Sequence, residues 1–426
     1  MKMRRRRRVN RLMELPSHIL VNILLRLPSE SICCIRCVAK DLLNTVDDYS
    51  FAKLHMAAAA DGINLMSFAE PYSSETSAVV ASLQPVKYDG AAAMTTRGKY
   101  AFKVSTTPHR REYPTYTIDF VFRNLFCFRS KYDPGVCFLI NPPMGQVLTL
   151  PRNDISKDAK SQIFNDWYGM GFDHATNTLK ILTVAMINAR FLAAQVLVLG
   201  TSSWRHIAPP PCSLSGGVNM YSANSACVNG DMHWLVYGDF RGRQGTCHIL
   251  SFDFEKEQFY WTPHPILQSS DDDRYIFWHL HLLTFRGSLA MVDTSLSQGT
   301  ITKIDIWVLQ DHQWAKQYGI DINNFELVKE FGWLVDVTCG QWEHGIYFKN
   351  FAKIPTFFLD LRCYSMNIVT CGSGERTRIL TYTGSLKSLK NFVGAENLKS
   401  CGNLIEEEAH GFHLSKRHVL QGVSVS

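Results

Sequence analysis

Two histidines and two cysteines are the residues of this chain whose spacing comes nearest to metal or redox chemistry. His279 and His281 alternate along an apolar stretch, so an extended strand would point both side chains to one face. Zinc sites need three or four ligands, and no third ligand is identifiable nearby. Cys34 and Cys37 have the C-x-x-C spacing, but a second ligand pair is missing and both lie in a helical apolar pattern. We therefore interpret these cysteines as packing thiols and expect no metal site.

Other short motifs also fall short of an active site. Residues 270–273, Ser-Asp-Asp-Asp, lack the regular ligand spacing and the distal Glu of an EF-hand, so we expect a solvated turn. The stretch GSGER at 372–376 is a short glycine-containing turn, much weaker than a phosphate-binding loop. The sequence also shows no P-loop, no Gly-x-Ser-x-Gly elbow and no dinucleotide fingerprint. We predict neither catalytic residues nor a cofactor.

The positive charge of the chain is concentrated in its first residues. The 426 residues carry a net charge of +6, of which Lys2, Arg4 to Arg8 and Arg11 contribute +7, so the remainder carries −1. A basic segment of this kind is typical of a nuclear-import or polyanion-binding arm, or of a solvated chain end. Because the body is nearly neutral, nucleic-acid binding is at most an accessory activity.

The sequence predicts neither an export signal nor a membrane anchor. The apolar stretch after the arginines is interrupted by Glu14, Pro16, His18 and Asn22, and no small-residue cleavage site follows. No apolar run approaches the ~18 residues needed to span a bilayer. The 12 cysteines are then expected to be reduced thiols. We expect the protein in the nucleus, the cytoplasm or both.

Residues 13–58 are predicted to form three short helices after a disordered basic tail at 1–12. Pro16 suits the first turn of a helix that Pro28 closes, and Ser29 is expected to cap the next helix. The apolar residues of the first helix cover well over half of its circumference, whereas a helix packed on one neighbour needs a stripe of about 100°. A domain of about forty residues normally needs disulfides, a metal or a partner. We therefore expect the remaining apolar face to bind another protein.

This helical segment resembles the F-box motif over its whole length. The usual motif has Leu-Pro, Ile-Leu, Arg-Leu-Pro, then Arg-x-Val-Cys-Lys-x-Trp and a terminal Phe-x-x-x-His; this sequence departs from it at Ala39 and Leu42, where Cys and Trp are common. The resemblance implies docking onto the SKP-family adaptor of an SCF-type cullin-RING ubiquitin ligase. The alternative is a helical cap that folds back on the rest of the chain. The side chains implied for adaptor contact are Leu15, Pro16, Ile19, Leu20, Ile23, Leu24, Leu27, Pro28, Ile32, Ile35, Val38, Lys40 and Leu42.

From about residue 116 the chain repeats a unit of about 55 residues. An apolar strand, a polar turn and a second strand recur, with starts at 138, 196, 249, 306 and 358. A second motif, a strand opened by a glycine turn, recurs at Gly230, Gly287 and Gly345, where we expect positive φ in tight hairpins. Each unit holds at least four short β segments, which is close to the kelch class of propeller blade. Three tryptophans near the turns are expected to fill the space between blades: Trp204, Trp261 and Trp314.

We predict a multi-domain protein with a small all-α module and a large all-β, propeller-like domain. The expected boundaries are a linker with early strands at 59–115, the β domain at 116–393 and a C-terminal tail at 394–426. A β-sandwich is the alternative fold, because hairpins alone do not show that the array closes.

The repeat region also resembles the F-box-associated interaction domain of plant F-box proteins. The stretches INPPMGQVLTLP, YGMGFDHATNTLKIL, VLVLGTSSWRHI, CVNGDMHWL and ILSFDFEKEQF stand in the order of that family, within about residues 135–385. The two resemblances together imply a non-catalytic substrate receptor that binds the adaptor with one domain and a target protein with the other. The alternative is a propeller enzyme or carbohydrate-binding protein with an incidental helical head. The target and the residues that bind it are not predicted.

Overall fold

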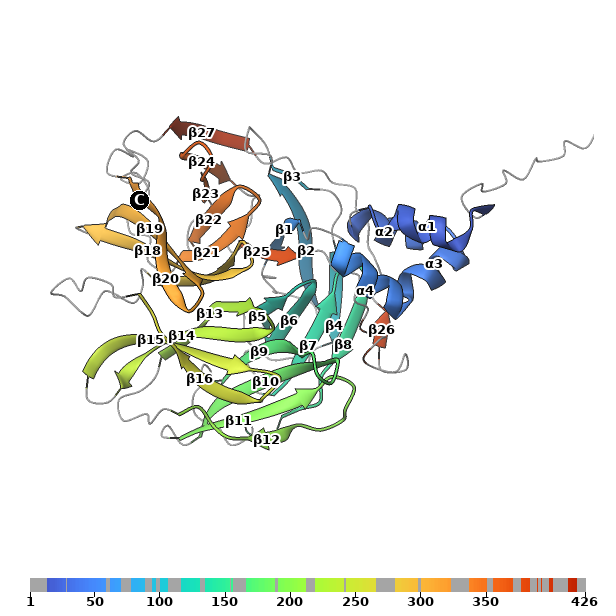
Figure 1. The fold of residues 1–426 in the computed structure, drawn as a ribbon, viewed down its shortest axis with the longest axis horizontal. Helices are drawn as coiled ribbons and strands as arrows, with labels where there is room; N and C mark the ends of the chain where they lie inside the picture. Colours follow the sequence, from blue (N-terminus) through green and yellow to red (C-terminus); the bar gives the residue numbers. More distant parts are fainter. Residues whose placement is uncertain are drawn as a thin grey trace, which may run out of the picture.

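The fold is that of a computed structural model, in which an α-helical module adjoins a large ring of β-sheets (Figure 1). The structure describes residues 14–27, 29–58, 62–69, 78–88, 94–96, 100–105, 116–130, 135–153, 155, 166–187, 191–211, 219–240, 243–265, 280–297, 300–322, 337–350, 355–370, 377–383, 389, 392, 398–400 and 413–419. No helix in these ranges is long and apolar enough to cross a membrane.

The helical module contains four short helices where the sequence analysis expected three. They are α1 (Ser17–Leu24), α2 (Ser29–Arg36), α3 (Lys40–Asp47) and α4 (Tyr49–Ala58). The second expected helix is divided because Ala39 is extended, with φ −150° and ψ 149°. Asp48 caps α4 by accepting hydrogen bonds from the backbone N–H groups of Ser50 and Phe51 at 2.8 and 3.2 Å.

Six antiparallel sheets form the blades of the β domain; the repeat predicted the propeller-like fold but not the number of blades. Their strands are, in blade 1, β1 (Ile63–Ala69), β2 (Ala78–Tyr88), β3 (Met94–Thr96), β4 (Tyr100–Ser105) and β25 (Thr377–Thr383); in blade 2, β5 (Tyr116–Phe122), β6 (Leu125–Ser130), β7 (Cys137–Asn141), β8 (Gln146–Thr149) and β26 (Leu398–Ser400); in blade 3, β9 (Asp166–Asp173), β10 (Thr178–Ile187), β11 (Phe191–Val198) and β12 (Arg205–Ile207); in blade 4, β13 (Asn219–Val228), β14 (Asp231–Phe240), β15 (Arg243–Asp253) and β16 (Gln258–Thr262); in blade 5, β17 (Leu280–Phe285), β18 (Ser288–Ser297), β19 (Thr300–Gln310) and β20 (Gln313–Asp321); and in blade 6, β21 (Val337–Trp342), β22 (Gly345–Asn350), β23 (Pro355–Asp360), β24 (Ser365–Thr370) and β27 (His413–Val419).

The ring closes through a strand from the far end of the chain. The inner strands contact one another in the order β25, β5, β9, β13, β17, β21 and back to β25. Strand β25 pairs antiparallel with β1, from Ile63 opposite Thr383 to Ala69 opposite Thr377. Blade 1 is therefore built from both ends of the β domain, which protects the two edges that an open array would expose. This closure excludes the β-sandwich alternative.

The boundaries expected for the β domain differ from the structure at both ends. Strands between residues 63 and 105 already form blade 1, so the domain begins well before residue 116. The expected tail is also wrong in part, because β26 pairs with β8 and β27 pairs with β24. Pairing over three and six positions adds an outer strand to blades 2 and 6.

Glycines occupy turns and close contacts within and between blades. Gly230 and Gly287 have φ of +94° and +81° in their hairpin turns, as predicted. The same expectation is wrong for Gly345, which lies in β22 and is needed for space, because a Cβ there would lie 2.0 Å from the carbonyl oxygen of Leu359. Gly171 in β9 likewise gives room to blade 4, since a Cβ would lie 2.1 Å from the ring of Phe254.

Tryptophans join neighbouring blades, as expected for two of the three. The indole N–H of Trp204 in blade 3 donates to the carbonyl of Pro151, which follows blade 2, at 2.7 Å. Trp314 in blade 5 donates in the same way to Pro263, which follows blade 4, at 2.6 Å. Trp261 instead packs its half-buried ring on the core of blades 2 to 4.

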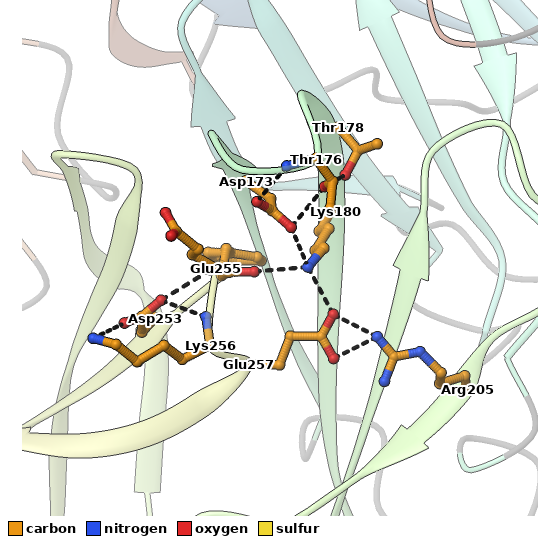
Figure 2. Close-up of polar contacts among 10 residues, drawn as sticks. Asp173, Thr176, Thr178, Lys180, Arg205, Asp253, Glu255, Lys256 and Glu257 are labelled. Carbon is orange, nitrogen blue, oxygen red and sulfur yellow. Dashed lines mark hydrogen bonds and ion pairs between the residues drawn. The ribbon is translucent and has the colours of Figure 1, made fainter.

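A buried lysine links blades 3 and 4 (Figure 2). The ammonium group of Lys180 on β10 lies 2.7 Å from a carboxylate oxygen of Asp173 and 2.7 Å from one of Glu257. It also donates to the carbonyl oxygen of Phe254 at 2.9 Å. Glu257, in the β15–β16 turn, is shared with Arg205 on β12. Burial opposes the ionised forms, but the hydrogen bonds from Lys180 and its neighbours outweigh it and lower the pKa of both Asp173 and Glu257.

Candidate docking surface

The helical module has an apolar core of its own. Leu24 and Leu42 are each 1% exposed and Ile32 is fully buried, together with side chains from α3 and α4. Leu20 belongs to the same cluster. These four residues were among the side chains implied for adaptor contact, but in the structure they pack inside the module and cannot form an external surface.

A second group of apolar side chains of the module lies on its surface. Ile19 and Ile23, one turn apart on α1, are each 40% exposed, and Val38 in the α2–α3 turn is 66% exposed. Leu54 on α4, which the sequence analysis did not select, is 52% exposed. Aliphatic side chains exposed to this degree on a small helical module are what a partner would cover. We call Ile19, Ile23 and Val38 the docking residues.

The other residues of the predicted set are exposed, half-buried or outside the described residues. Pro16 and Lys40 are exposed. Leu15, Leu27 and Ile35 are half-buried, and the last two pack against the module core. Pro28 lies outside the described residues.

Polar contacts hold the four helices in one arrangement. The guanidinium group of Arg36 on α2 donates two hydrogen bonds to the carboxylate of Asp47 on α3, at 2.5 and 2.8 Å. This bond raises the pKa of Arg36 although partial burial opposes it. His55 on α4 bonds through Nε2 to the carbonyl oxygen of Leu27 at 2.8 Å. The α1–α2 connection is thereby fixed to α4, so the docking residues are presented on a defined surface.

The module is also fixed to the propeller by one side chain that the sequence analysis missed. Met144, in the β7–β8 turn of blade 2, is 6% exposed and belongs to the apolar core of the helical module. The turn is shaped by Gly145, which has φ +61° and donates its backbone N–H to Pro142. A methionine in a turn is ordinarily a surface residue. The one sequence signal for this contact is that an apolar side chain stands at the tip of the NPPMGQ hairpin.

The residues considered for metal or redox chemistry lie partly outside the described part of the chain. His281 is buried in β17, whereas His279, the loop at 270–273 and the stretch at 372–376 lie outside the described residues. Cys34 and Cys37 are exposed, so their interpretation as packing thiols is wrong. Within the described ranges all cysteines are free thiols, and no three His, Cys, Asp or Glu side chains are grouped as a metal would require.

Comparisons with known protein families match both parts of the chain. Residues 81–344 match the family described as "F-box associated beta propeller domain", and residues 12–54 match "F-box domain". An F-box/LRR-repeat protein of Arabidopsis thaliana is 21% identical over 371 residues, which covers 82% of this chain and 79% of that protein. An F-box/kelch-repeat protein of the same plant is 22% identical over 318 residues, covering 72% and 79%.

Solved structures overlap with this chain at low sequence identity. A fucose-specific lectin from Aleuria aurantia is 9% identical, with a TM-score of 0.33, and the overlap covers 77% of this chain and 97% of the lectin. A similarity of this size says nothing about the ligands of the present chain.

Proposed function

This chain belongs to the F-box proteins that carry an F-box associated beta propeller domain, and from this premise we propose that it is the substrate-recognition subunit of an SCF-type cullin-RING ubiquitin ligase. The F-box binds an SKP-family adaptor, and the propeller binds the protein to be ubiquitinated. The single observation that supports the adaptor contact best is the exposure of Ile19, Ile23 and Val38 on a module whose core is already complete without them.

The proposed contact follows the physics of aliphatic anchors. Covering an exposed Ile or Val side chain contributes roughly 1 to 2 kcal/mol, and a few such anchors at the centre of an interface supply most of its binding free energy. The buried residues of the module support the contact indirectly, because they hold α1 and the α2–α3 turn in place. In this proposal the adaptor contact belongs to the docking residues and their half-buried neighbours, not to the module core.

The receptor itself carries out no chemical step in this proposal. Its contribution is proximity, because a target held by the propeller has a high effective concentration of its lysines near the ubiquitin carrier of the complex. The nucleus, the cytoplasm or both are the proposed locations, supported by the arginine-rich segment at 4–8, which lies outside the described residues.

Copurification with an SKP-family adaptor tests the proposal. The wild-type chain is expected to form a stable complex at micromolar concentrations, and Ile23→Asp is expected to weaken it at least tenfold by placing a charge in an apolar contact. Asn22→Asp is the matched control, because it adds the same charge to an exposed polar position of the same helix. Leu24→Asp is unsuitable as an interface probe, since Leu24 lies in the module core.

The proposal fails if the wild-type chain and the adaptor do not associate. That outcome would favour the alternative of a propeller enzyme or carbohydrate-binding protein with an incidental helical head. If Ile23→Asp and Asn22→Asp bind the adaptor equally well, the docking residues are wrongly assigned. Circular dichroism of both variants establishes that the helices are intact.

A further inference from the structure

A cavity of about 610 Å³ lies on the axis of the propeller. Its walls include residues from all six inner strands, for example Phe120 of β5, Leu282 of β17 and Ile379 of β25. The volume lies within the ~300 to 1,000 Å³ of sites that hold small ligands or short peptide segments. The lining combines apolar side chains with convergent polar groups, which is the composition of a binding site.

The cavity lies toward one defined end of the axis. It is lined by the carboxyl-terminal parts of the inner strands and by the turns that follow them, among them Arg123, Asn229, Gly230 and Gly287. The last residue of β25 lies at the same end of the propeller axis, because the backbone N–H of Thr383 donates to the carbonyl of Arg123 at 3.3 Å. The lining also reaches toward the starts of two of these strands, because it includes Ile118 of β5 and Arg378, the second residue of β25.

The F-box joins the propeller at this same end. Consecutive antiparallel strands place alternate turns on one side, so the β7–β8 turn that carries Met144 shares a side with the β5–β6 turn that carries Arg123. Strand β1, which follows the helices, begins at Ile63, opposite Thr383. Two separate connections thus place the helical module and the cavity on one face of the propeller. A protein held at the cavity would lie on the side from which the adaptor is reached.

The charged side chains of the cavity are predominantly cationic. Asp119 is the one acidic residue among the described lining residues, and its carboxylate accepts a hydrogen bond from Arg129 and one from the backbone N–H of Tyr168, both at 3.1 Å. Arg123 and Arg378 supply two guanidinium groups from β5–β6 and from β25. Arg378 also reaches the carbonyl oxygen of Ile118 at 3.5 Å, which ties it to the inner wall. The described lining residues thus carry two formal positive charges, on Arg123 and Arg378, against the one negative charge of Asp119.

We propose that this cavity recognises an acidic segment of the target protein, with Asp or Glu carboxylates of a peptide placed against Arg123 and Arg378. This proposal rests on the proposed substrate-receptor function and names the chemistry of its substrate. Arginine suits the role because its planar guanidinium group presents several donors to a carboxylate. The apolar wall, which includes Phe120 and Leu282, receives aliphatic or aromatic side chains that flank the acidic ones.

Fluorescence anisotropy with the full-length chain tests the proposal. The probes are short fluorescein-labelled peptides of otherwise identical sequence that carry Glu, Gln or Lys between leucines. The Glu peptide is expected to bind about tenfold more tightly than the Gln peptide and to lose affinity as salt rises, whereas the Lys peptide binds most weakly. Arg123→Glu and Arg378→Glu are each expected to lower the affinity for the Glu peptide about tenfold. Lys87→Glu is the control, because Lys87 is exposed on β2 outside the cavity and its substitution changes the net charge by the same amount. This variant is expected to alter the affinity for the Glu peptide by less than about twofold.

Several results would overturn the proposal. They are no binding of the Glu peptide, equal binding of the three peptides, or an equal loss of affinity in Lys87→Glu. Binding of a matched phosphoserine peptide without binding of the Glu peptide would refute the carboxylate assignment. Arg378→Lys, which keeps the charge, must retain more affinity than Arg378→Glu if charge is the cause and not misfolding. Adaptor copurification of the same variants is measured separately, so failure of the cavity and failure of the proposed receptor function give different results.

Discussion

Lys180 bridges blades 3 and 4 by its contacts with Asp173 and Glu257. Replacing Lys180 with methionine tests whether these contacts stabilise the protein electrostatically. Methionine keeps the length and most of the volume of the side chain but removes the ammonium group. Asp173, whose side chain is 3% exposed, then loses its buried cation, and the carbonyl of Phe254 loses a hydrogen-bond donor. Glu257 keeps Arg205, and Asp173 keeps the hydroxyl and backbone N–H of Thr176.

The expected cost follows from the carboxylate left behind. Removing one partner of a buried ion pair typically destabilises a protein by about 3 to 5 kcal/mol, because an uncompensated charge remains in a site of low polarity. The contacts kept by Glu257 and Asp173 place the expected loss for Lys180→Met toward the lower end, at about 3 kcal/mol at pH 7. Lys316→Met is the matched control. Lys316 is 27% exposed and shares Asp305 with Lys303, so that carboxylate keeps a cation, and the expected loss is about 1 kcal/mol or less.

The pH dependence distinguishes this mechanism from loss of packing. In the wild type the pKa values of Asp173 and Glu257 are lowered, so their contribution to stability is present above their ordinary values of 3.8 and 4.5 and is lost as pH falls below them. In Lys180→Met the carboxylate of Asp173 is buried without its cation, so its pKa rises and protonation relieves the penalty. The difference in unfolding free energy between the two proteins should therefore shrink from pH 7 toward pH 4.

Urea denaturation followed by tryptophan fluorescence, repeated at several pH values, measures this difference. A loss that is the same at pH 7 and pH 4.5 would assign the role of Lys180 to packing. A loss no larger than that of Lys316→Met would refute the reasoning altogether.

Two further substitutions test the contact of Met144 with the helical module and the contact of Gly171 with blade 4. Met144→Asp places a charge in the core of the module, so it should speed proteolytic cleavage between residues 58 and 63 while the fluorescence of the propeller stays unchanged; an unchanged cleavage rate would show that the joint carries little free energy. Gly171→Ala should lower the free energy of unfolding by about 1 to 3 kcal/mol, because the new Cβ meets Phe254, whereas Gly62→Ala, with nothing within 4 Å, should leave it within about 0.5 kcal/mol.

The features predicted from the sequence are those that neighbouring residues determine. Positive φ at Gly230 follows from the turn chemistry of Asn229-Gly230, and the outer hairpins follow from apolar strands separated by polar turns. Trp204 and Trp314 recur at equivalent positions, so the repeat itself predicted that they join blades.

The features that were missed depend on residues far apart in the chain. Closure of blade 1 brings Ile63 opposite Thr383, and no local pattern identifies which late strand pairs with which early one. The side chains implied for adaptor contact divide into core and surface residues for the same reason, because contacts between separate helices decide which of them are buried. Ile19 and Leu20 are neighbours of equal hydrophobicity, and only the placement of α2 to α4 decides that Leu20 is buried while Ile19 is 40% exposed.

In the proposed receptor function, the contacts between the helical module and the propeller matter because proximity depends on how rigidly the two domains are connected. A receptor raises the effective concentration of a target lysine only if the link between its two binding sites holds them within reach, and a loose link dilutes the effect. Here the helical module is joined to the propeller twice, through the chain that enters β1 and through Met144 in the module core. Both joints lie on the face that carries the cavity, and Arg123 stands in the adjoining turn of the same blade as Met144. In the proposed receptor function, weakening the contact of Met144 with the module core should therefore reduce ubiquitination of a bound target while the affinity of the propeller for that target stays unchanged.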